Sequence, residues 1–242
     1  MTEIKTPLTN SSSPRKNLVI SMFNNISGKY DFLNHFLSLG VDKYWRRKAI
    51  SMLEPYKPQL ILDVATGTGD LAISALRLNP KKITGIDISD GMLEIGIKKL
   101  NRRSLNNVIE LLQGDSENIN YPDNHFDAAM VAFGVRNFEN LQKGLGEIKR
   151  VLKPGAPFVI LEFSKPSVFP IKQLYYFYFR YILPFIGKFF SKDNAAYTYL
   201  PDSVLKFPEG KEFLAVLKSM EFKDGFQKRL TFGISTIYFA VK

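Results

Sequence analysis

The chain has 242 residues, 45% of them hydrophobic, which suits one domain with a substantial core. It contains no cysteine, which excludes disulfides, cysteine-ligated metals and a cysteine nucleophile, and its two histidines, His35 and His125, lie too far apart in the sequence to predict a metal site. A net charge of +10 favours an anionic partner, either nucleic acid or an acidic membrane surface, although lysines spread along a chain also serve solubility alone.

The first part of the chain predicts a tail followed by a helical cap. Residues 1–16 are polar and rich in Ser and Thr, without the apolar stretch of a signal peptide, so we expect a disordered tail and a cytoplasmic protein. Residues 17–58 carry apolar side chains at helical spacing, for example Val19, Met22 and Tyr30. No run of 18 apolar residues occurs, so no segment is predicted to span a membrane.

The next part alternates between strands and helices. Apolar runs predict strands at 59–65, 82–87, 107–113, 126–132 and 156–163, and helices are expected at 69–78, 90–103 and 137–152. This pattern predicts an α/β fold with a mostly parallel, doubly wound sheet, and we assign 59–164 to its cofactor-binding core. Ligands bind at the carboxyl ends of the strands in such sheets.

The first strand ends in an acid and a glycine turn. Asp63 is followed by Gly67 and Gly69, and the second strand ends at Asp87. Glycines let the backbone approach a ligand, and an acid at the tip of the second strand can hold ribose hydroxyls. With Ala72, this spacing also satisfies the loose dinucleotide fingerprint, so a hydride-transfer enzyme is one alternative.

Three further features favour S-adenosylmethionine. Asp63 lies where it can receive the ammonium of the methionine part, and a pyrophosphate would be repelled there. Asp115 and Ser116 end the third strand, where an acid can accept a hydrogen bond from the adenine amino group. Residues 150–155 resemble the segment found before the next strand in class I methyltransferases. The sequence therefore predicts an adenosine cofactor that donates a methyl group, and no metal.

Residues 165–210 interrupt the alternation. Nine of the 17 residues in 174–190 are aromatic, against 13% for the chain. We expect this helical insertion to line a channel for an apolar tail and to face a membrane surface, with Arg180, Lys188 and Lys192 meeting lipid headgroups. An ordinary aromatic helix beneath a lid is the alternative. The remaining sequence predicts a helix at 209–220 and a closing antiparallel pair of strands at 222–230 and 233–241, and we assign 211–242 to this C-terminal part.

Several segments then resemble one family. These are Lys29–Asn34, Leu37–Gly40, Trp45–Arg46, Phe133–Asn137 and Leu161–Pro166. They are similar to the menaquinone and ubiquinone C-methyltransferase family, in the same order over about residues 20–242. The resemblance implies a class I S-adenosylmethionine-dependent methyltransferase over 17–242, Rossmann-like, with its last strand antiparallel. One departure is Ala65, where many methyltransferases carry glycine, and another is Ala132, where some members have serine.

The family implies methyl transfer to a ring carbon of a polyprenylated hydroquinone. Demethylmenaquinol is the expected acceptor, and the benzoquinol of the ubiquinone pathway is the alternative. The residues expected to contact the cofactor, or to shape its site, are Asp63, Gly67, Thr68, Gly69, Asp87, Asp115, Ser116 and Phe133.

Four residues are candidates for the chemistry. Arg136 is expected to stabilise a ring phenolate, Asn137 to orient a ring oxygen, and Tyr30 with Asp31 to close over the substrate, with Asp31 as a possible base. The alternative for Arg136 is a structural pair with a strand-end carboxylate such as Glu162. The alternative for Tyr30 and Asp31 is that they only cap and pack a helix.

Two other functions remain as alternatives. A nucleic-acid methyltransferase fits the charge, but the chain lacks a cysteine nucleophile and an Asn/Asp-Pro-Pro-Tyr motif, so no nucleic-acid partner is expected. A lipid-binding scaffold on a degenerate fold would not need Asp63, Asp87 and Asp115. We expect a peripheral membrane contact, and the sequence leaves open whether the chain forms a homo-oligomer.

Overall fold

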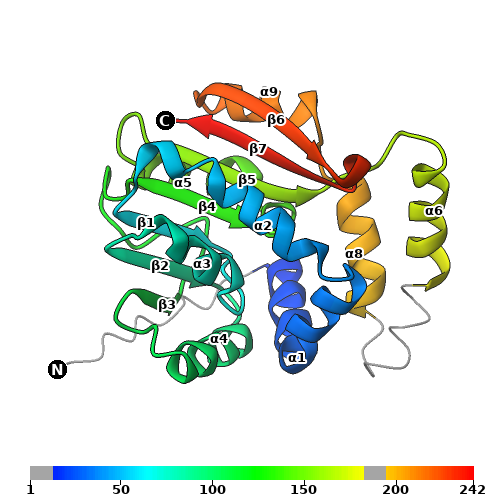
Figure 1. Ribbon diagram of the computed structural model, residues 1–242, viewed down its shortest axis with the longest axis horizontal. Helices are drawn as coiled ribbons and strands as arrows, with labels where there is room; N and C mark the ends of the chain where they lie inside the picture. The colour runs from blue at the N-terminus through cyan, green and yellow to red at the C-terminus, as the bar shows by residue number, and fades with distance from the viewer. Residues whose placement is uncertain (1–12, 183–194) are drawn as a thin grey trace.

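The computed structural model describes residues 13–182 and 195–242, whose helices and strands follow the predicted alternation (Figure 1). The elements before the insertion are α1 (Pro14–Leu37), α2 (Val41–Ser51), η1 (Glu54–Tyr56), β1 (Leu60–Val64), α3 (Asp70–Ala75), η2 (Leu76–Leu78), β2 (Lys82–Asp87), α4 (Asp90–Arg102), β3 (Ile109–Gln113), β4 (Ala128–Ala132), η3 (Val135–Asn137), α5 (Leu141–Val151) and β5 (Pro157–Phe163). The later elements are α6 (Ile171–Phe177), the π-helix η4 (Tyr178–Ile182), α8 (Ala195–Lys206), α9 (Lys211–Ser219), β6 (Lys223–Leu230), η5 (Thr231–Gly233) and β7 (Ser235–Val241).

The strands form one sheet in the order β3-β2-β1-β4-β5-β7-β6. Strands β1 to β5 are all parallel to one another, whereas β7 is antiparallel to both β5 and β6. Because β1 lies between β2 and β4, the order of the strands reverses beside it, and ligands bind at such a switch point. The predicted α/β sheet with an antiparallel last strand is therefore confirmed.

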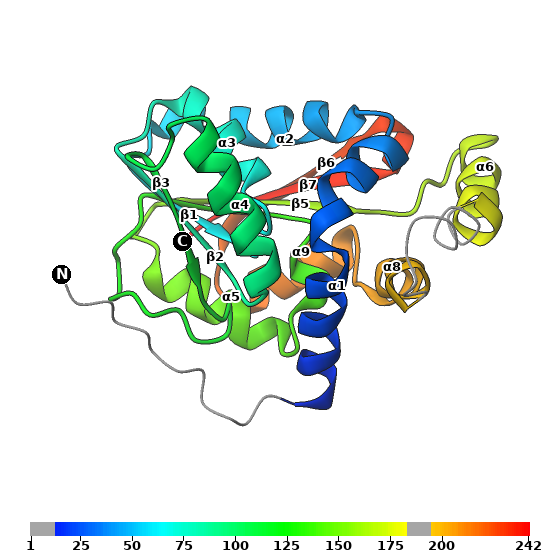
Figure 2. The same cartoon turned by 90° about the horizontal axis from the view of Figure 1, so that it is seen from below.

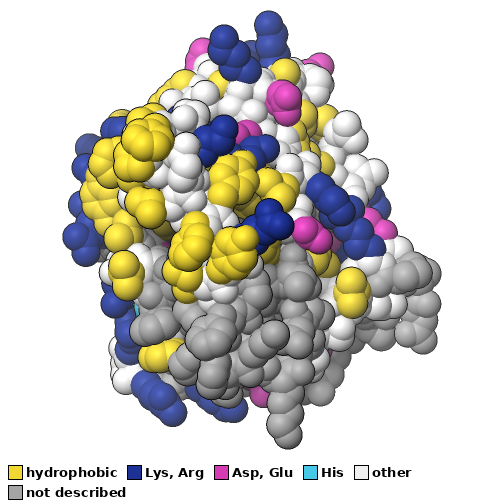
Figure 3. All heavy atoms as spheres, turned by 90° about the vertical axis from the view of Figure 1, so that its right-hand side faces the viewer, with side chains coloured by type: hydrophobic (Ala, Val, Ile, Leu, Met, Phe, Trp, Pro, Cys, Tyr) yellow, Lys and Arg dark blue, Asp and Glu magenta, His cyan; other side chains and the backbone are white. Residues whose placement is uncertain are grey.

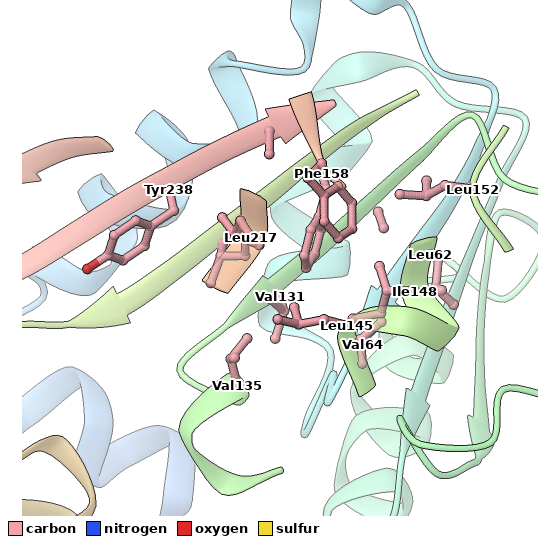
Figure 4. Close-up of a cluster of buried hydrophobic side chains, with 14 of the residues drawn as sticks. Leu62, Val64, Val131, Val135, Leu145, Ile148, Leu152, Phe158, Leu217 and Tyr238 are labelled. Atoms are coloured by element: carbon pink, nitrogen blue, oxygen red, sulfur yellow. The ribbon is translucent and has the colours of Figure 1, made fainter. Parts of the chain in front are cut away.

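The sheet is buried on both faces by helices (Figure 2). Alternate residues of β1 point to opposite faces: Leu62 belongs to the cluster under α5 and α9, and Ile61 belongs to the cluster under α2 and α3. Figure 4 shows the first cluster, with Leu145 and Ile148 of α5 beside Phe158 of β5. Continuous burial of the central strands explains why they are apolar at nearly every position.

Local signals set where the helices begin. The Ser89 hydroxyl caps α4 by accepting a hydrogen bond from the Met92 amide at 3.3 Å, and the Asn140 side chain caps α5 through the Lys143 amide at 3.0 Å. Long α1 lies beyond the carboxyl ends of the parallel strands, next to α4 and α8 (Figures 1 and 2). It begins at Pro14, so the end of the predicted tail is helical instead; residues 1–12 lie outside the described residues.

The insertion differs most from its prediction. Its first helix begins at Ile171 and widens into the π-helix η4. The expected continuation over 183–190, which includes Lys188, lies outside the described residues, and so does Lys192. Helix α8 was not predicted as a helix, and it contains Pro201, which normally disfavours a helix interior. Among the described helices, none is long and apolar enough to cross a membrane.

Candidate functional site

A pocket of about 720 Å³, which includes open solvent at its mouth, lies at the carboxyl ends of β1 to β4. Its wall comes from the ends of these strands and the turns after them, from α1, from the first turn of α4 and from the segment between β4 and α5. The lining residues are Lys16, Val19, Phe23, Tyr30, Ala65, Gly67, Asp87, Ile88, Met92, Gly114, Asp115, Ser116, Glu117, Ala132, Phe133, Gly134, Asn137, Phe138 and Glu139. The pocket therefore occupies the edge of the sheet where the sequence places the ligand.

The turn after β1 brings its backbone to the tip of β2. Gly67 and Gly69 have φ values of +57° and +80°, in the left-handed region that glycine adopts without strain. One carboxylate oxygen of Asp87 accepts a hydrogen bond from the Gly67 amide at 2.8 Å, and the other accepts from the Ser89 amide at 2.9 Å. Burial raises the pKa of Asp87 despite these bonds. Asp87 thus joins the two turns and still lines the pocket.

Asp63 lies behind this turn as a buried carboxyl group. Its Oδ2 accepts a hydrogen bond from the Thr66 hydroxyl at 2.6 Å, whereas its Oδ1 is buried and has no hydrogen-bond partner among the described residues. Burial raises the pKa of Asp63 from 3.8 to about 7, and the Thr66 hydroxyl only partly offsets this. Buried polar atoms rarely lack a partner, so Asp63 has the capacity to hold a cationic or hydrogen-bonding ligand group.

The turn after β3 supplies a second acid to the wall. Asp115 accepts a hydrogen bond from the Glu117 amide at 2.9 Å, and its other oxygen is paired with the ammonium of Lys16 from α1. Ser116 lines the pocket beside it. The sequence placed Lys16 in a tail, because nothing in its polar surroundings indicates that it reaches an acid 99 positions away. A ligand that bonds to Asp115 must share this carboxylate with Lys16.

Part of α1 is held over the pocket by charged contacts. The Asp31 carboxylate accepts a hydrogen bond from the Thr68 hydroxyl at 2.5 Å and lies 2.5 Å from the Lys99 ammonium, which also contacts Asp70 at 2.7 Å. Tyr30, the residue before Asp31, lines the pocket. Asp31 and Thr68 are therefore engaged with each other behind the lining, whereas Tyr30 lines the pocket together with Lys16, Val19 and Phe23 of the same helix.

Beyond β4, the chain turns sharply at Phe133, which has a φ of +58° and stacks on Phe163 at a centroid distance of 4.4 Å. Arg136 is directed away from the pocket lining: its guanidinium lies 2.6 Å from the fully buried Glu162 carboxylate and donates to the Phe133 carbonyl oxygen at 2.5 Å. The alternative pairing of Arg136 with Glu162 is the one present. Burial raises the pKa of Glu162, and Arg136 opposes this.

Asn137 follows Arg136 and lines the pocket. Its carbonyl oxygen Oδ1 accepts a hydrogen bond from the Tyr199 hydroxyl of α8 at 3.1 Å. The two neighbours thus face in different directions, Arg136 towards β5 and Asn137 towards the pocket.

The structure divides the predicted site residues into two groups. Those that line the pocket are Tyr30, Gly67, Asp87, Asp115, Ser116, Phe133 and Asn137, whereas those behind the lining are Asp31, Asp63, Thr68, Gly69 and Arg136. The sequence missed Lys16, Phe23, Met92, Phe138 and Glu139 as lining residues. Phe23 belongs to an apolar helix face that periodicity assigns to the core, and no sequence signal separates a pocket wall from a core position.

Comparison with known proteins gives one consistent family. The model of the ubiE/COQ5 methyltransferase family matches residues 9–242. Demethylmenaquinone methyltransferase from Bacteroides fragilis is 49% identical over 93% of this chain and 92% of its own length. Ubiquinone/menaquinone biosynthesis C-methyltransferase from Geobacter sulfurreducens is 46% identical over 90% of this chain and 85% of its own.

Solved structures agree with the fold. An S-adenosylmethionine-dependent methyltransferase from Thermotoga maritima, described as a possible histamine N-methyltransferase, superposes with a TM-score of 0.65 at 18% identity, over 92% of this chain and 99% of its own. At this identity, the likeness supports the class I methyltransferase fold.

Proposed function

The chain belongs to the ubiE/COQ5 methyltransferase family, and on that premise we propose that it transfers a methyl group from S-adenosylmethionine to a ring carbon of demethylmenaquinol. The observation that carries the proposal is the pocket: its strand-end acids and glycine turn lie at one edge of the sheet, in a chain 49% identical to a demethylmenaquinone methyltransferase. A quinol acceptor also agrees with its apolar wall of Phe23, Met92, Phe133 and Phe138.

The residues of the pocket fit the cofactor. The oxygen of Asp63 that lacks a partner is suited to the ammonium of the methionine part, directly or through water, and Asp87 is suited to the ribose hydroxyls. Asp115 would accept from the adenine amino group, with Ser116 beside it. When bound, S-adenosylmethionine supplies a methyl group made electrophilic by its sulfonium.

The chain must place the acceptor carbon and exclude water. A hydroquinone carbon becomes nucleophilic when a ring hydroxyl loses its proton, and a group that stabilises the resulting oxyanion lowers the barrier. We assign this role to the Asn137 amide and assign closure over the ring to Tyr30, because both line the pocket. Arg136 is neutralised by Glu162 and Asp31 by Lys99, so we assign both to holding the walls.

The acceptor is tested by offering two quinols. Wild-type protein with labelled S-adenosylmethionine should methylate reduced, short-tailed demethylmenaquinol with a higher kcat/KM than 2-methoxy-6-polyprenyl-1,4-benzoquinol. The second quinol is included because a relative at 46% identity carries a ubiquinone/menaquinone name. Preference for the benzoquinol would move the protein to the other acceptor, and methylation of neither would contradict the proposal.

The proposed function includes a peripheral membrane contact through α6 and η4. Val168, Phe169, Leu174 and Phe177 are 54–77% exposed, and Figure 3 shows apolar side chains gathered on this side of the molecule, with lysines and arginines among them. Lys172 and Arg180 are exposed within the same segment. Exposed apolar side chains with cations among them suit the headgroup region of an anionic bilayer, where a polyprenylated quinol would be met.

Replacing Phe169 and Phe177 together with serine should weaken binding to vesicles rich in phosphatidylglycerol at least about tenfold, because each buried aromatic contributes more than about 1 kcal/mol. Vesicle co-sedimentation measures the effect. Ile97→Ser, which removes an exposed apolar side chain from α4, is the matched control and should bind as wild type does. Equal binding by the double variant would contradict a membrane contact at this surface.

A further inference from the structure

Helix α8 is fastened to η3 by two side chains one helical turn apart. The Tyr199 hydroxyl donates to Oδ1 of Asn137 at 3.1 Å, and the Ser203 hydroxyl accepts from Nε of Arg136 at 3.2 Å. Residues four apart lie on the same side of a helix, so a single face of α8 holds two consecutive residues of η3. Of these two residues, only Asn137 lines the pocket.

In the structure, the bond from the Tyr199 hydroxyl holds the Asn137 amide with its carbonyl oxygen turned towards α8. An asparagine side chain has a carbonyl oxygen that accepts and an NH₂ group that donates. Since the carbonyl oxygen is turned to Tyr199, the NH₂ group is on the other side of the amide, and no acceptor among the described residues bonds to it. Without Tyr199, the amide gains freedom to flip and to present its carbonyl oxygen to the pocket.

We infer that Tyr199 is a positioning residue for methyl transfer, which holds the Asn137 amide so that its NH₂ group donates to the ring oxygen of the quinol. This inference rests on the proposed function and extends it to a residue of the insertion that does not line the pocket. The ring hydroxyl loses its proton to water, and the electron pair of the oxyanion moves through the ring so that the neighbouring carbon bonds to the methyl carbon. The sulfur–methyl bond would break with its electron pair going to sulfur, which leaves as S-adenosylhomocysteine. The proton on the attacked ring carbon is then lost to water, which restores the hydroquinone. A fixed donor stabilises the oxyanion, whereas a flipped amide would repel it.

Tyr199→Phe removes only the hydroxyl that fixes the amide. We expect kcat to fall about 10- to 100-fold, which does not exceed the decrease in kcat caused by removing an entire oxyanion donor. The dissociation constant for S-adenosylmethionine should stay unchanged. Loss of a well-placed donor should also raise the pKa of the bound quinol hydroxyl. Since kcat increases with pH as this hydroxyl ionises, the pH at which kcat increases should move upward by about one unit for each tenfold decrease in kcat. Merely loosened packing would not move this profile.

Two further variants make the test decisive. Asn137→Asp still accepts the Tyr199 bond but has no NH₂ group and carries a negative charge, so its kcat should fall at least as far, and adding Tyr199→Phe should cost little more. Tyr44→Phe, the same change at an exposed tyrosine of α2, is the control and should keep wild-type kcat.

The outcomes separate this inference from the function beneath it. A wild-type protein that methylates no quinol overturns the proposed function and the inference with it. Wild-type turnover together with an unchanged kcat and pH profile in Tyr199→Phe overturns the positioning role alone. Should Tyr199→Phe fail to fold, wild-type kcat in Asn137→Asp would overturn the role instead.

Discussion

Replacing Arg136 with methionine should lower the free energy of unfolding by about 3–5 kcal/mol, because it leaves the buried charge of Glu162 without a partner. It also removes the donor that bonds the Phe133 carbonyl oxygen at the sharp turn after β4. Urea unfolding followed by circular dichroism measures the change. An Arg136→Met protein as stable as wild type would contradict a structural role for the pair.

The double variant Arg136→Met/Glu162→Gln separates structure from chemistry. With no charge left unpaired, it should regain most of the lost stability, as buried ion pairs replaced by neutral groups commonly do. Because we assign Arg136 to the wall of the site, the folded double variant should keep methyl transfer within about tenfold of wild type. A folded double variant that loses about a thousandfold would instead show that the positive charge of Arg136 acts in the reaction.

The affinity for S-adenosylmethionine should fall about tenfold for each pH unit below 7. Burial raises the pKa of Asp63 to about 7, so below that pH the free protein carries the protonated acid, and an ammonium group binds the ionised form. Binding therefore releases a proton. Isothermal titration between pH 5.5 and 7.5, in two buffers of different ionisation enthalpy, measures both effects.

Asp63→Asn tests the assignment, since the amide cannot ionise. It should bind the cofactor weakly, and its dissociation constant should vary little with pH over the same range. The same shift in pKa also affects the stability of the wild-type protein. Between about pH 4 and pH 7, Asp63 is protonated in the folded protein but ionised in the unfolded chain. The contribution of this group to the free energy of unfolding is therefore lost as the pH rises through that range. Asp123→Asn, an exposed acid, is the control. An affinity that is flat with pH in wild-type protein would contradict the role of Asp63.

The sequence predicts the sheet and one edge of the site well, because both depend on local patterns. Apolar runs locate the strands. The pairing of β1 with β2 places the Gly67 amide 2.8 Å from the Asp87 carboxylate, and both residues were predicted from the glycine turn and the strand end alone. Boundaries shift by two or more residues where a tight turn intervenes. The helix expected from residue 137, for instance, becomes η3 followed by α5, which begins at Leu141.

What the sequence does not predict depends on contacts between distant segments. Lys16 finds Asp115 only because α1 folds across the sheet edge. The position of Arg136 after a strand permits either a free cation in the site or a pair with Glu162, and only the turn at Phe133 decides between them. Tyr199 escapes notice because α8 contains a proline and its contact with Asn137 spans 62 positions.

The central claim is that the chain forms a carbon–carbon bond, and the position of the transferred methyl group tests it most directly. S-Adenosylmethionine labelled with ¹³C in its methyl group would be incubated with reduced, short-tailed demethylmenaquinol, and the product analysed by NMR after oxidation. The account predicts one ¹³C methyl group attached to a ring carbon of the naphthoquinone. A label attached to a ring oxygen, or an acceptor recovered without label, would contradict it.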